Sequence, residues 1–193
     1  SGGLVFSRDE KIYHRALGHA DRGKPVWRKG VNLNDPGLAS FPALNFNTDE
    51  LSCAIGVASL KRLQATIERR NTFVHKLIEL MAPRSRYCRP YSFHGGFSPF
   101  YLPIFVDTDA LTCTKNEFAE ALVAEGIPAN IDYGCVISDW EWARDCLSDD
   151  FVTTNAVKTR DTSFNLFLNE QYGTQEAEDV VRAIEKLEAN FSK

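Results

Sequence analysis

The stretch Ala43-Leu44-Asn45-Phe46-Asn47-Thr48-Asp49-Glu50-Leu51-Ser52-Cys53-Ala54-Ile55-Gly56 decides the fold, because it marks the start of a long helix. Asn47 can cap that helix, and Glu50, three residues later, can reach back to the Asn47 amide. We therefore expect a helix over residues 48–82. Apolar residues recur along it at helical spacing, namely Leu51, Ile55, Ala58, Leu63, Ile67, Val74, Leu77 and Met81.

Asn45 lies two residues ahead of the expected helix cap. A helix N-terminus presents unpaired N–H groups and the positive end of the helix dipole, so it attracts anions. The Asn45 amide is therefore a candidate donor to a phosphate group. The structural alternative is a turn asparagine that precedes a long core helix.

Composition limits the class of protein. The chain has 193 residues, of which 44% are hydrophobic, so it can bury a sizeable core. Its net charge of −4, with both signs interspersed, argues against a nucleic-acid partner. No apolar run is long enough to span a membrane.

Five cysteines, an odd number without a C-x-x-C pair, predict reduced thiols in the cytoplasm and neither a disulfide framework nor a metal site. Cys53 and Cys146 are expected to be small core residues.

The region before the long helix is expected to hold a strand at residues 4–6 and a helix opened by the capping box at residues 7–10 and running to about Leu17. A loop rich in Gly, Pro and Asn follows over residues 18–42. Its cations suit either a diphosphate ligand or a solvated, mobile loop. They are Arg22, Lys24, Arg28 and Lys29.

Strands and helices alternate after Pro83. Strands are expected at residues 100–106, 128–133 and 163–168, and Pro103 predicts an edge strand or a bulge. A capping box at Thr114 opens a helix that Gly126 closes. Further helices are expected at residues 155–159 and from a cap at Thr174. This pattern predicts a small α+β domain, with helices on one face of a short, mostly antiparallel sheet.

Four segments resemble, in order, the DegT/StrS family of pyridoxal-phosphate (PLP) sugar aminotransferases. Residues 43–56 resemble its N-[YF]-R-M-[ST]-E-L-x-A-A-I-G stretch, with Asn47-Thr48 in place of Arg-Met. Residues 1–7 resemble the G-E-G-G-[LM]-[VI]-x-[TS] strand that follows the Schiff-base lysine. Residues 154–156 and 163–168 resemble the P-N-A…S-x-x-L-P stretch.

The resemblance implies the C-terminal part of a fold-type I PLP-dependent transferase. Residues 1–47 would be the remnant of the large PLP-binding domain, residues 48–82 a connector helix, and residues 83–193 the small domain. Asn45 would contact the cofactor phosphate of the neighbouring subunit in a homodimer. The Schiff-base lysine would precede Ser1, so we expect this chain alone to bind no PLP and to be inactive.

Candidate substrate-binding residues are His19, His94 and Tyr133. His19 and His94 are expected in loops, where a histidine can exchange protons or contact sugar hydroxyls, although a lone histidine is more often a surface residue. The family often has His-Tyr where this chain has Asp132-Tyr133. Tyr133 therefore faces the substrate in one interpretation and is a buried structural tyrosine in the other.

Three functions remain open at this level. The resemblance implies transfer of an amino group from glutamate to a nucleotide-linked keto-sugar. A sugar dehydratase of the same superfamily, which lacks the lysine, is the second possibility. The third is a non-catalytic dimerisation or binding module, in which the long helix serves an interface.

Overall fold

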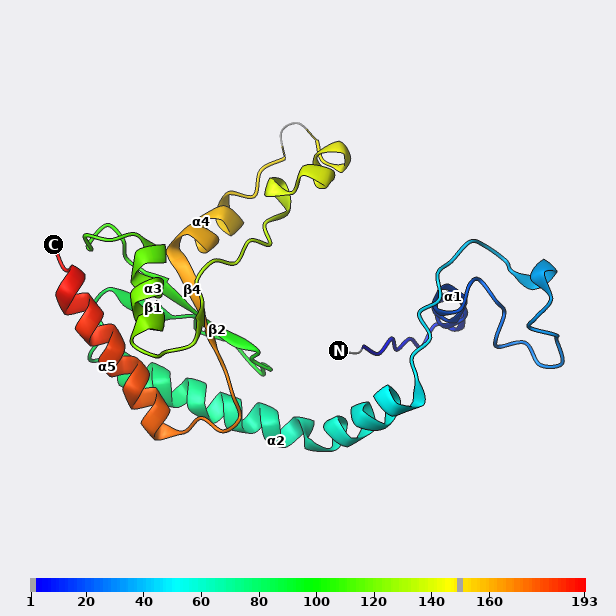
Figure 1. Ribbon diagram of the computed structural model, residues 1–193, viewed down its shortest axis with the longest axis horizontal. Coiled ribbons are helices and arrows are strands. Elements are labelled where there is room, and N and C mark those ends of the chain that lie inside the picture. Colours follow the sequence, from blue (N-terminus) through cyan, green and yellow to red (C-terminus); the bar gives the residue numbers. More distant parts are fainter. Residues whose placement is uncertain (1–2, 149–150) are drawn as a thin grey trace. The chain divides into compact units, whose positions relative to one another are not determined.

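The computed structural model describes residues 3–148 and 151–193 (Figure 1). The chain forms two compact units, Ser1–Leu63 and Gln64–Lys193. Ser1 and Gly2, which belong to the motif expected after the Schiff-base lysine, lie outside the described residues. The three-part domain division at residues 47 and 82 stays a prediction.

The long helix is confirmed as α2, Glu50–Met81, which is 32 residues long and runs unbroken through Arg69–Asn71. The predicted cap at Asn47 is wrong. Asp49 takes this role, because its Oδ1 accepts from the Ser52 N–H at 2.8 Å and its Oδ2 accepts from the Ser52 hydroxyl at 2.7 Å. The Asn47 side chain instead interacts with the Asp21 carboxylate and contributes to lowering its pKa.

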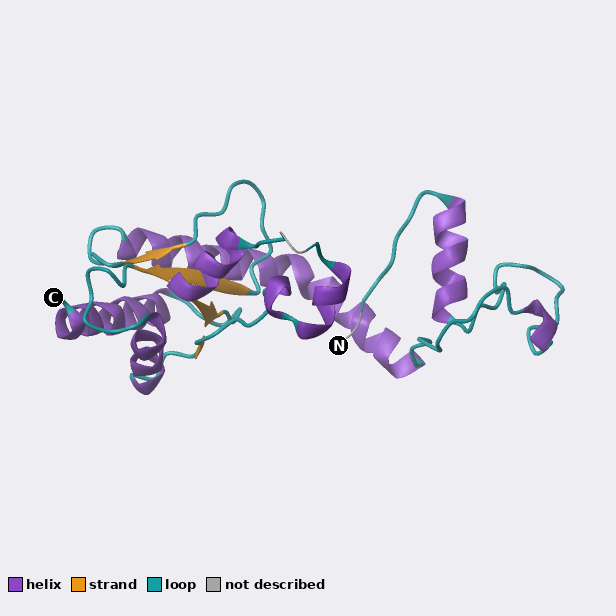
Figure 2. Ribbon diagram, turned by 90° about the horizontal axis from the view of Figure 1, so that it is seen from above, coloured by secondary structure: helices purple, strands orange, loops and turns teal. Residues whose placement is uncertain are grey.

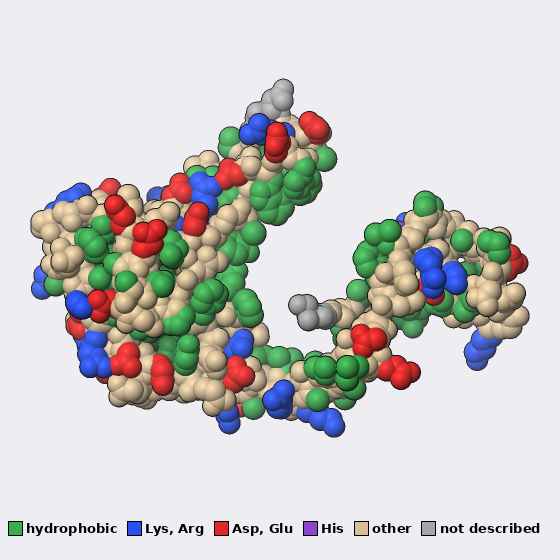
Figure 3. All heavy atoms as spheres, viewed as in Figure 1, with side chains coloured by type: hydrophobic (Ala, Val, Ile, Leu, Met, Phe, Trp, Pro, Cys, Tyr) green, Lys and Arg blue, Asp and Glu red, His purple; other side chains and the backbone are tan. Residues whose placement is uncertain are grey.

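The apolar stripe of α2 is buried over only part of its length. Phe73, Val74, Leu77 and Met81 are buried, whereas Leu51 is 71% exposed. Figure 3 shows hydrophobic side chains on this exposed N-terminal stretch of the helix. The spacing therefore predicted the helix correctly, but it did not show which turns are covered.

The part of residues 64–193 that the structure describes contains a four-stranded antiparallel sheet, in the order β1-β2-β4-β3. Figure 2 shows the strands in orange beside the purple helices. The antiparallel sheet predicted from the sequence is confirmed. Its register pairs Leu102 with Leu166 and Ile104 with Phe164. The strands are β1, Cys88–Pro90; β2, Tyr101–Val106; β3, Ala129–Asn130; and β4, Ser163–Phe167. β1 was not predicted, because it has only three residues and includes a proline.

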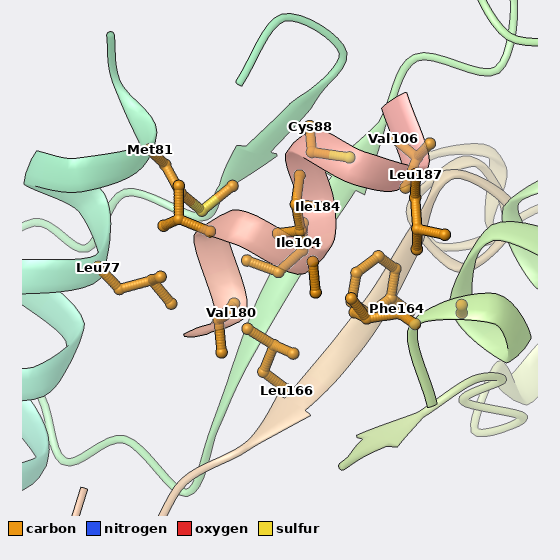
Figure 4. Packing of buried hydrophobic residues seen from close by; sticks show 14 of the residues in the cluster. Leu77, Met81, Cys88, Ile104, Val106, Phe164, Leu166, Val180, Ile184 and Leu187 are labelled. Carbon is orange, nitrogen blue, oxygen red and sulfur yellow. The ribbon is translucent and has the colours of Figure 1, made fainter. Parts of the chain in front are cut away.

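The core lies on one face of this sheet. Alternate residues of β2 are buried, as are Phe164 and Leu166 of β4. Side chains from α2 and α5 converge on these residues, as Figure 4 shows for Leu77 and Ile184. The helices of this unit after α2 are α3, Lys115–Ala124; α4, Thr154–Thr162; and α5, Thr174–Phe191; short 3₁₀ turns lie at η2, Ile137–Asp139, and η3, Glu141–Cys146.

Pro103 lies in β2, which is an interior strand, so the predicted edge strand is wrong. The Pro103 carbonyl accepts from the Tyr91 N–H at 2.8 Å, which places its missing N–H on the same side of the strand. β1 has already ended at Pro90. The sheet therefore tolerates this proline, because the lost donor faces a position where the ladder stops.

Among the predicted helix starts, only the one at Thr114 is confirmed without a shift. The capping box predicted at residues 7–10 is wrong, because Asp9 caps that helix, which begins at Glu10. Thr114 and Glu117 form the predicted capping box, and Gly126 follows the C-cap with φ +90°. The last helix differs by one residue, because Gly173 is its N-cap and the Glu176 carboxylate accepts from the Gly173 N–H at 2.7 Å.

The strand expected at residues 4–6 and the burial expected for Cys53 and Cys146 are both wrong. Residues 4–6 pair with no strand in the described part of the chain, and Leu4 is exposed. Cys53 and Cys146 are exposed, because α2 is uncovered at Cys53 and η3 packs only Ala143 inward.

Candidate functional site

A short backbone bridge holds Asn45 against the end of α1, Glu10–Ala20. Asn45 pairs with Asp21, and on either side the Arg22 N–H donates to the Leu44 carbonyl at 3.0 Å and the Phe46 N–H donates to the Ala20 carbonyl at 2.8 Å. These two backbone hydrogen bonds thus hold the Asn45 backbone in place just ahead of α2.

The Asn45 side chain is exposed. Its Oδ1 accepts from the Asn47 N–H at 3.2 Å, which forms an Asx turn. Within the described residues its Nδ2 makes no hydrogen bond, so the amide N–H groups can donate to a ligand. The uncommitted Nδ2 is therefore compatible with the phosphate donor predicted from the sequence. The Oδ1 atom of the same side chain closes a turn, so the alternative role as a turn asparagine is compatible with the structure as well.

A left-handed turn brings the bridge partners together. Arg22 has φ 54° and Gly23 has φ 74°. A Cβ on Gly23 would lie 2.0 Å from the Phe41 carbonyl oxygen. The Gly23 N–H donates to the Gly18 carbonyl at 2.8 Å, which closes the C-terminus of α1. Glycine is therefore required here both by the backbone conformation and by the close approach of the loop.

The loop over residues 18–42 is packed against α1 through rings. The His14 and Trp27 rings stack at 4.6 Å, and the His19 and Phe41 rings lie 4.5 Å apart. Pro25 is fully buried, and a 3₁₀ turn, η1, forms at Pro36–Leu38. The predicted loop is therefore present, although it begins after Ala20, and part of it is ordered against α1 by its aromatic residues.

The helix dipole does not supply the anion site that the sequence suggested. The Asp49 carboxylate already occupies the N-terminus of α2. A second anion placed there would be repelled by that carboxylate. Any phosphate contact in this unit therefore depends on the Asn45 amide and on the loop cations, of which Arg28 and Lys29 are exposed.

Asp21 gives this turn a dependence on pH. Hydrogen bonding from Arg22 holds the pKa of the Asp21 carboxyl below its ordinary value, with a further contribution from Asn47. A carboxyl whose pKa is lowered on folding stabilises the folded state above its unfolded pKa, and this contribution is lost as the pH falls through the folded pKa. We expect the turn to loosen only below about pH 4. NMR signals of the Arg22 Nε–H should shift in that range and should be independent of pH in Asp21→Asn.

The two candidate histidines differ from what was expected. His19 lies within the last turn of α1, rather than at the start of a loop, and its ring rests on Phe41. His94 is exposed in the loop between β1 and β2, as predicted, next to Gly95. In the described part of the chain His94 makes no hydrogen bond, ion pair or ring contact, and its substrate role stays a prediction.

Tyr133 lies in the segment that follows β3 and is 42% exposed, so the buried structural interpretation is wrong. Its ring centroid is 5.9 Å from that of Tyr101. Hydrogen bonding with Tyr101, followed by Cys135, raises the pKa of Tyr133 to about 12, so the phenol remains protonated at neutral pH.

The structure brings some of these candidates together. In residues 1–63, Asn45 faces Asp21, which follows His19 by two positions. In residues 64–193, Tyr133 and His94 lie on different loops, and no hydrogen bond, ion pair or ring contact between described residues joins them. Lys115, a buried lysine beside Asp132, was not among the predicted site residues, because it stands within a capping box that indicates only a helix start.

No helix among the described residues has both the length and the apolar character needed to cross a bilayer. Across residues 3–148 and 151–193, no group of three or more His, Cys, Asp and Glu side chains is placed to hold a metal ion.

Comparison with known proteins agrees with the fold and the motif order. The model of the DegT/DnrJ/EryC1/StrS aminotransferase family matches residues 1–185. The chain belongs to this family. No curated protein sequence matches the chain.

Among solved structures, the chain is similar to E. coli GDP-4-keto-6-deoxy-D-mannose-3-dehydratase with bound hydrated PLP (TM-score 0.75, 20% identity, covering 91% of this chain and 48% of that one). It is also similar to an aminotransferase from Psychrobacter cryohalolentis (TM-score 0.74, 17% identity, 95% and 50% covered). A third is the putative sugar aminotransferase Spr1654 from Streptococcus pneumoniae in its PMP form (TM-score 0.74, 16% identity, 95% and 46% covered). At these identities the likeness establishes the fold, and the chain spans about half the length of each structure.

Proposed function

We propose that this chain is the C-terminal part of a PLP-dependent aminotransferase that moves an amino group from glutamate to a nucleotide-linked keto-sugar. Family membership supports the class of reaction. The share of the solved structures that the chain covers supports the assignment to one part of a longer enzyme. Five free cysteines support a reducing, cytoplasmic location.

The observation that carries the proposal is the fixed, exposed Asn45 amide with an uncommitted Nδ2. In a homodimer, Asn45 donates this N–H to the phosphate of the cofactor in the neighbouring subunit, a charge-assisted hydrogen bond. PLP, when bound, supplies the electron-withdrawing ring on which amino transfer depends. The Tyr133 phenol, protonated at neutral pH, hydrogen-bonds to the sugar and orients it.

Replacing Asn45 with alanine should weaken PLP binding about tenfold or more, because a hydrogen bond to a charged group contributes about 1.5–3 kcal/mol. The measurement is the PLP dissociation constant of the protein expressed with its complete coding sequence, followed by absorbance. Asn34→Ala is the matched control, since Asn34 is also an exposed asparagine of this unit. Equal PLP affinity in the Asn45→Ala variant and the parent would remove Asn45 from the cofactor site.

The activity itself is tested by incubating the same protein with glutamate and a nucleotide-linked keto-sugar and measuring 2-oxoglutarate. Stoichiometric release of 2-oxoglutarate and of an amino sugar supports the proposal, and release of neither overturns it. The chain of 193 residues by itself should release none, because the resemblance assigns the Schiff-base lysine to a position ahead of Ser1.

A sugar dehydratase is the second candidate, because the E. coli dehydratase matches the fold as well as the aminotransferases do. The coding sequence ahead of Ser1 separates the two. A lysine several residues before Gly2 favours the aminotransferase, and a histidine there favours the dehydratase. If neither residue is found and PLP does not bind, a non-catalytic dimerisation module is the remaining interpretation.

A further inference from the structure

Lys115 is the first residue of α3 and is only 5% exposed. Its Nζ donates to the Ile131 carbonyl at 2.9 Å and lies 3.4 Å from Asp132 Oδ1. An ammonium group is costly to bury unless it is paired and hydrogen-bonded. A lysine whose only role was to attach a surface loop could remain in solvent. The burial of Lys115 therefore indicates that its ammonium group has to be held at a fixed position.

The two acceptors of Lys115 belong to consecutive residues directly ahead of Tyr133. The Tyr133 ring lies beside the ring of Tyr101 in β2, with the two ring centroids 5.9 Å apart. The Asp132 side chain remains 58% exposed. The segment is thus held by a buried cation and contacted by a strand residue, while the Asp132 carboxylate and the Tyr133 ring still reach solvent.

Among the nearby carboxylates, Asp132 is the one that pairs directly with Lys115. Asp161 feels the Lys115 charge but makes its hydrogen bond with Arg160, at 2.8 Å. Arg160 also pairs with Asp139. The Lys115 ammonium is therefore shared with no carboxylate at hydrogen-bond distance other than Asp132 within the described residues.

We propose that Lys115 is a positioning residue that presents the Asp132 carboxylate and the Tyr133 phenol as one hydrogen-bonding edge for the hydroxyl groups of a sugar. A carboxylate accepts from hydroxyls, and a phenol both donates and accepts, so the pair suits a polyhydroxylated ring. The ammonium offsets the Asp132 charge, which keeps the edge compatible with an anionic nucleotide sugar. This inference rests on the proposed function for its ligand class, but not for its geometry.

The geometric part is tested on the 193-residue chain with Lys115→Met, which keeps the length of the side chain and removes its charge. Lys186→Met is the matched control, because Lys186 pairs with Glu125 on the surface. In a Cys53→Ser, Cys146→Ser background, the exposed Cys135 reports on the segment through its rate of reaction with a thiol reagent. We expect this rate to rise about fivefold, and the NMR signals of the Tyr133 ring to move, only in Lys115→Met.

The ligand part is tested by saturation-transfer NMR with UDP-glucose as the probe, on the protein expressed with its complete coding sequence. Transfer to the glucose protons should fall about tenfold in Lys115→Met and partly return in Lys115→Arg. Unchanged Cys135 rates, Tyr133 signals and transfer would overturn the proposal. If Lys115→Met does not fold, Asp132→Asn tests the same hydrogen-bonding edge, because Asp132 is its exposed carboxylate. The same changes in the Cys135 rate, the Tyr133 signals and the transfer are expected, and their absence would overturn the proposal.

The two proposals can fail separately. Absence of 2-oxoglutarate release from the unsubstituted protein defeats the aminotransferase and leaves the Cys135 and Tyr133 measurements intact. Normal release, together with unmoved Tyr133 signals in Lys115→Met and Asp132→Asn, defeats the positioning role alone.

Discussion

Replacing Glu188 with alanine is expected to lower the free energy of unfolding by about 3–5 kcal/mol. Glu188 lies on α5 and is only 5% exposed. Its carboxylate accepts from the Ser85 hydroxyl at 2.6 Å and from the N–H groups of Arg86, Tyr87 and Cys88 at 2.9 Å each. Alanine would leave the N–H groups of Arg86 and Tyr87 without a partner at the entrance to β1, and the Cys88 N–H with only the Ser85 hydroxyl, at 3.2 Å.

Urea unfolding followed by circular dichroism measures this loss. Glu120→Ala is the matched control, since Glu120 is an exposed glutamate on α3, and it should change the free energy of unfolding by less than about 0.5 kcal/mol. Glu188→Gln keeps one acceptor oxygen and should fall between the two. A Glu188→Ala variant as stable as the parent would show that water replaces the carboxylate fully.

Gly23→Ala should destabilise the turn that holds Asn45 by about 2–4 kcal/mol. Two effects add at this position, because alanine is disfavoured at φ 74° and its Cβ would lie 2.0 Å from the Phe41 carbonyl oxygen. The Phe41 backbone must move, which also breaks the hydrogen bond from the Ser40 N–H to the Gly23 carbonyl, 2.9 Å long. The Asp21–Asn45 bridge depends on the same turn.

Hydrogen exchange measures the effect, with loss of protection expected at the Gly23, Ser40 and Phe46 amides. Gly30→Ala separates the two causes, because Gly30 has the same φ of 74° but nothing lies within 4 Å of its Cβ. That control should lose about 1–2 kcal/mol from backbone strain alone. Equal effects of the two substitutions would mean that the contact with Phe41 relaxes freely.

Helix and strand placement followed from the sequence where local chemistry decides it. The Thr114 box and the stripe of α2 were both predicted, because capping and helical spacing involve residues a few positions apart. The capping residue of α2 was misplaced by two positions, since Asn47 had a competing partner in Asp21, which is distant in the sequence. β1 was missed for the same kind of reason, because the backbone of its first residue, Cys88, is held by Glu188, which lies 100 positions later in the chain.

Some residues of the candidate site were predicted, but Lys115 and the geometry of the site were not. Asn45 and Tyr133 were identified from a motif, which gives no information on exposure. The antiparallel small domain, the long helix and the family membership were determined by the sequence alone, because periodicity and motif order are properties of a linear pattern. Only the tertiary structure decided that Lys115 is buried beside Asp132, and that a glycine turn fixes Asn45, since both depend on contacts between segments far apart in the chain.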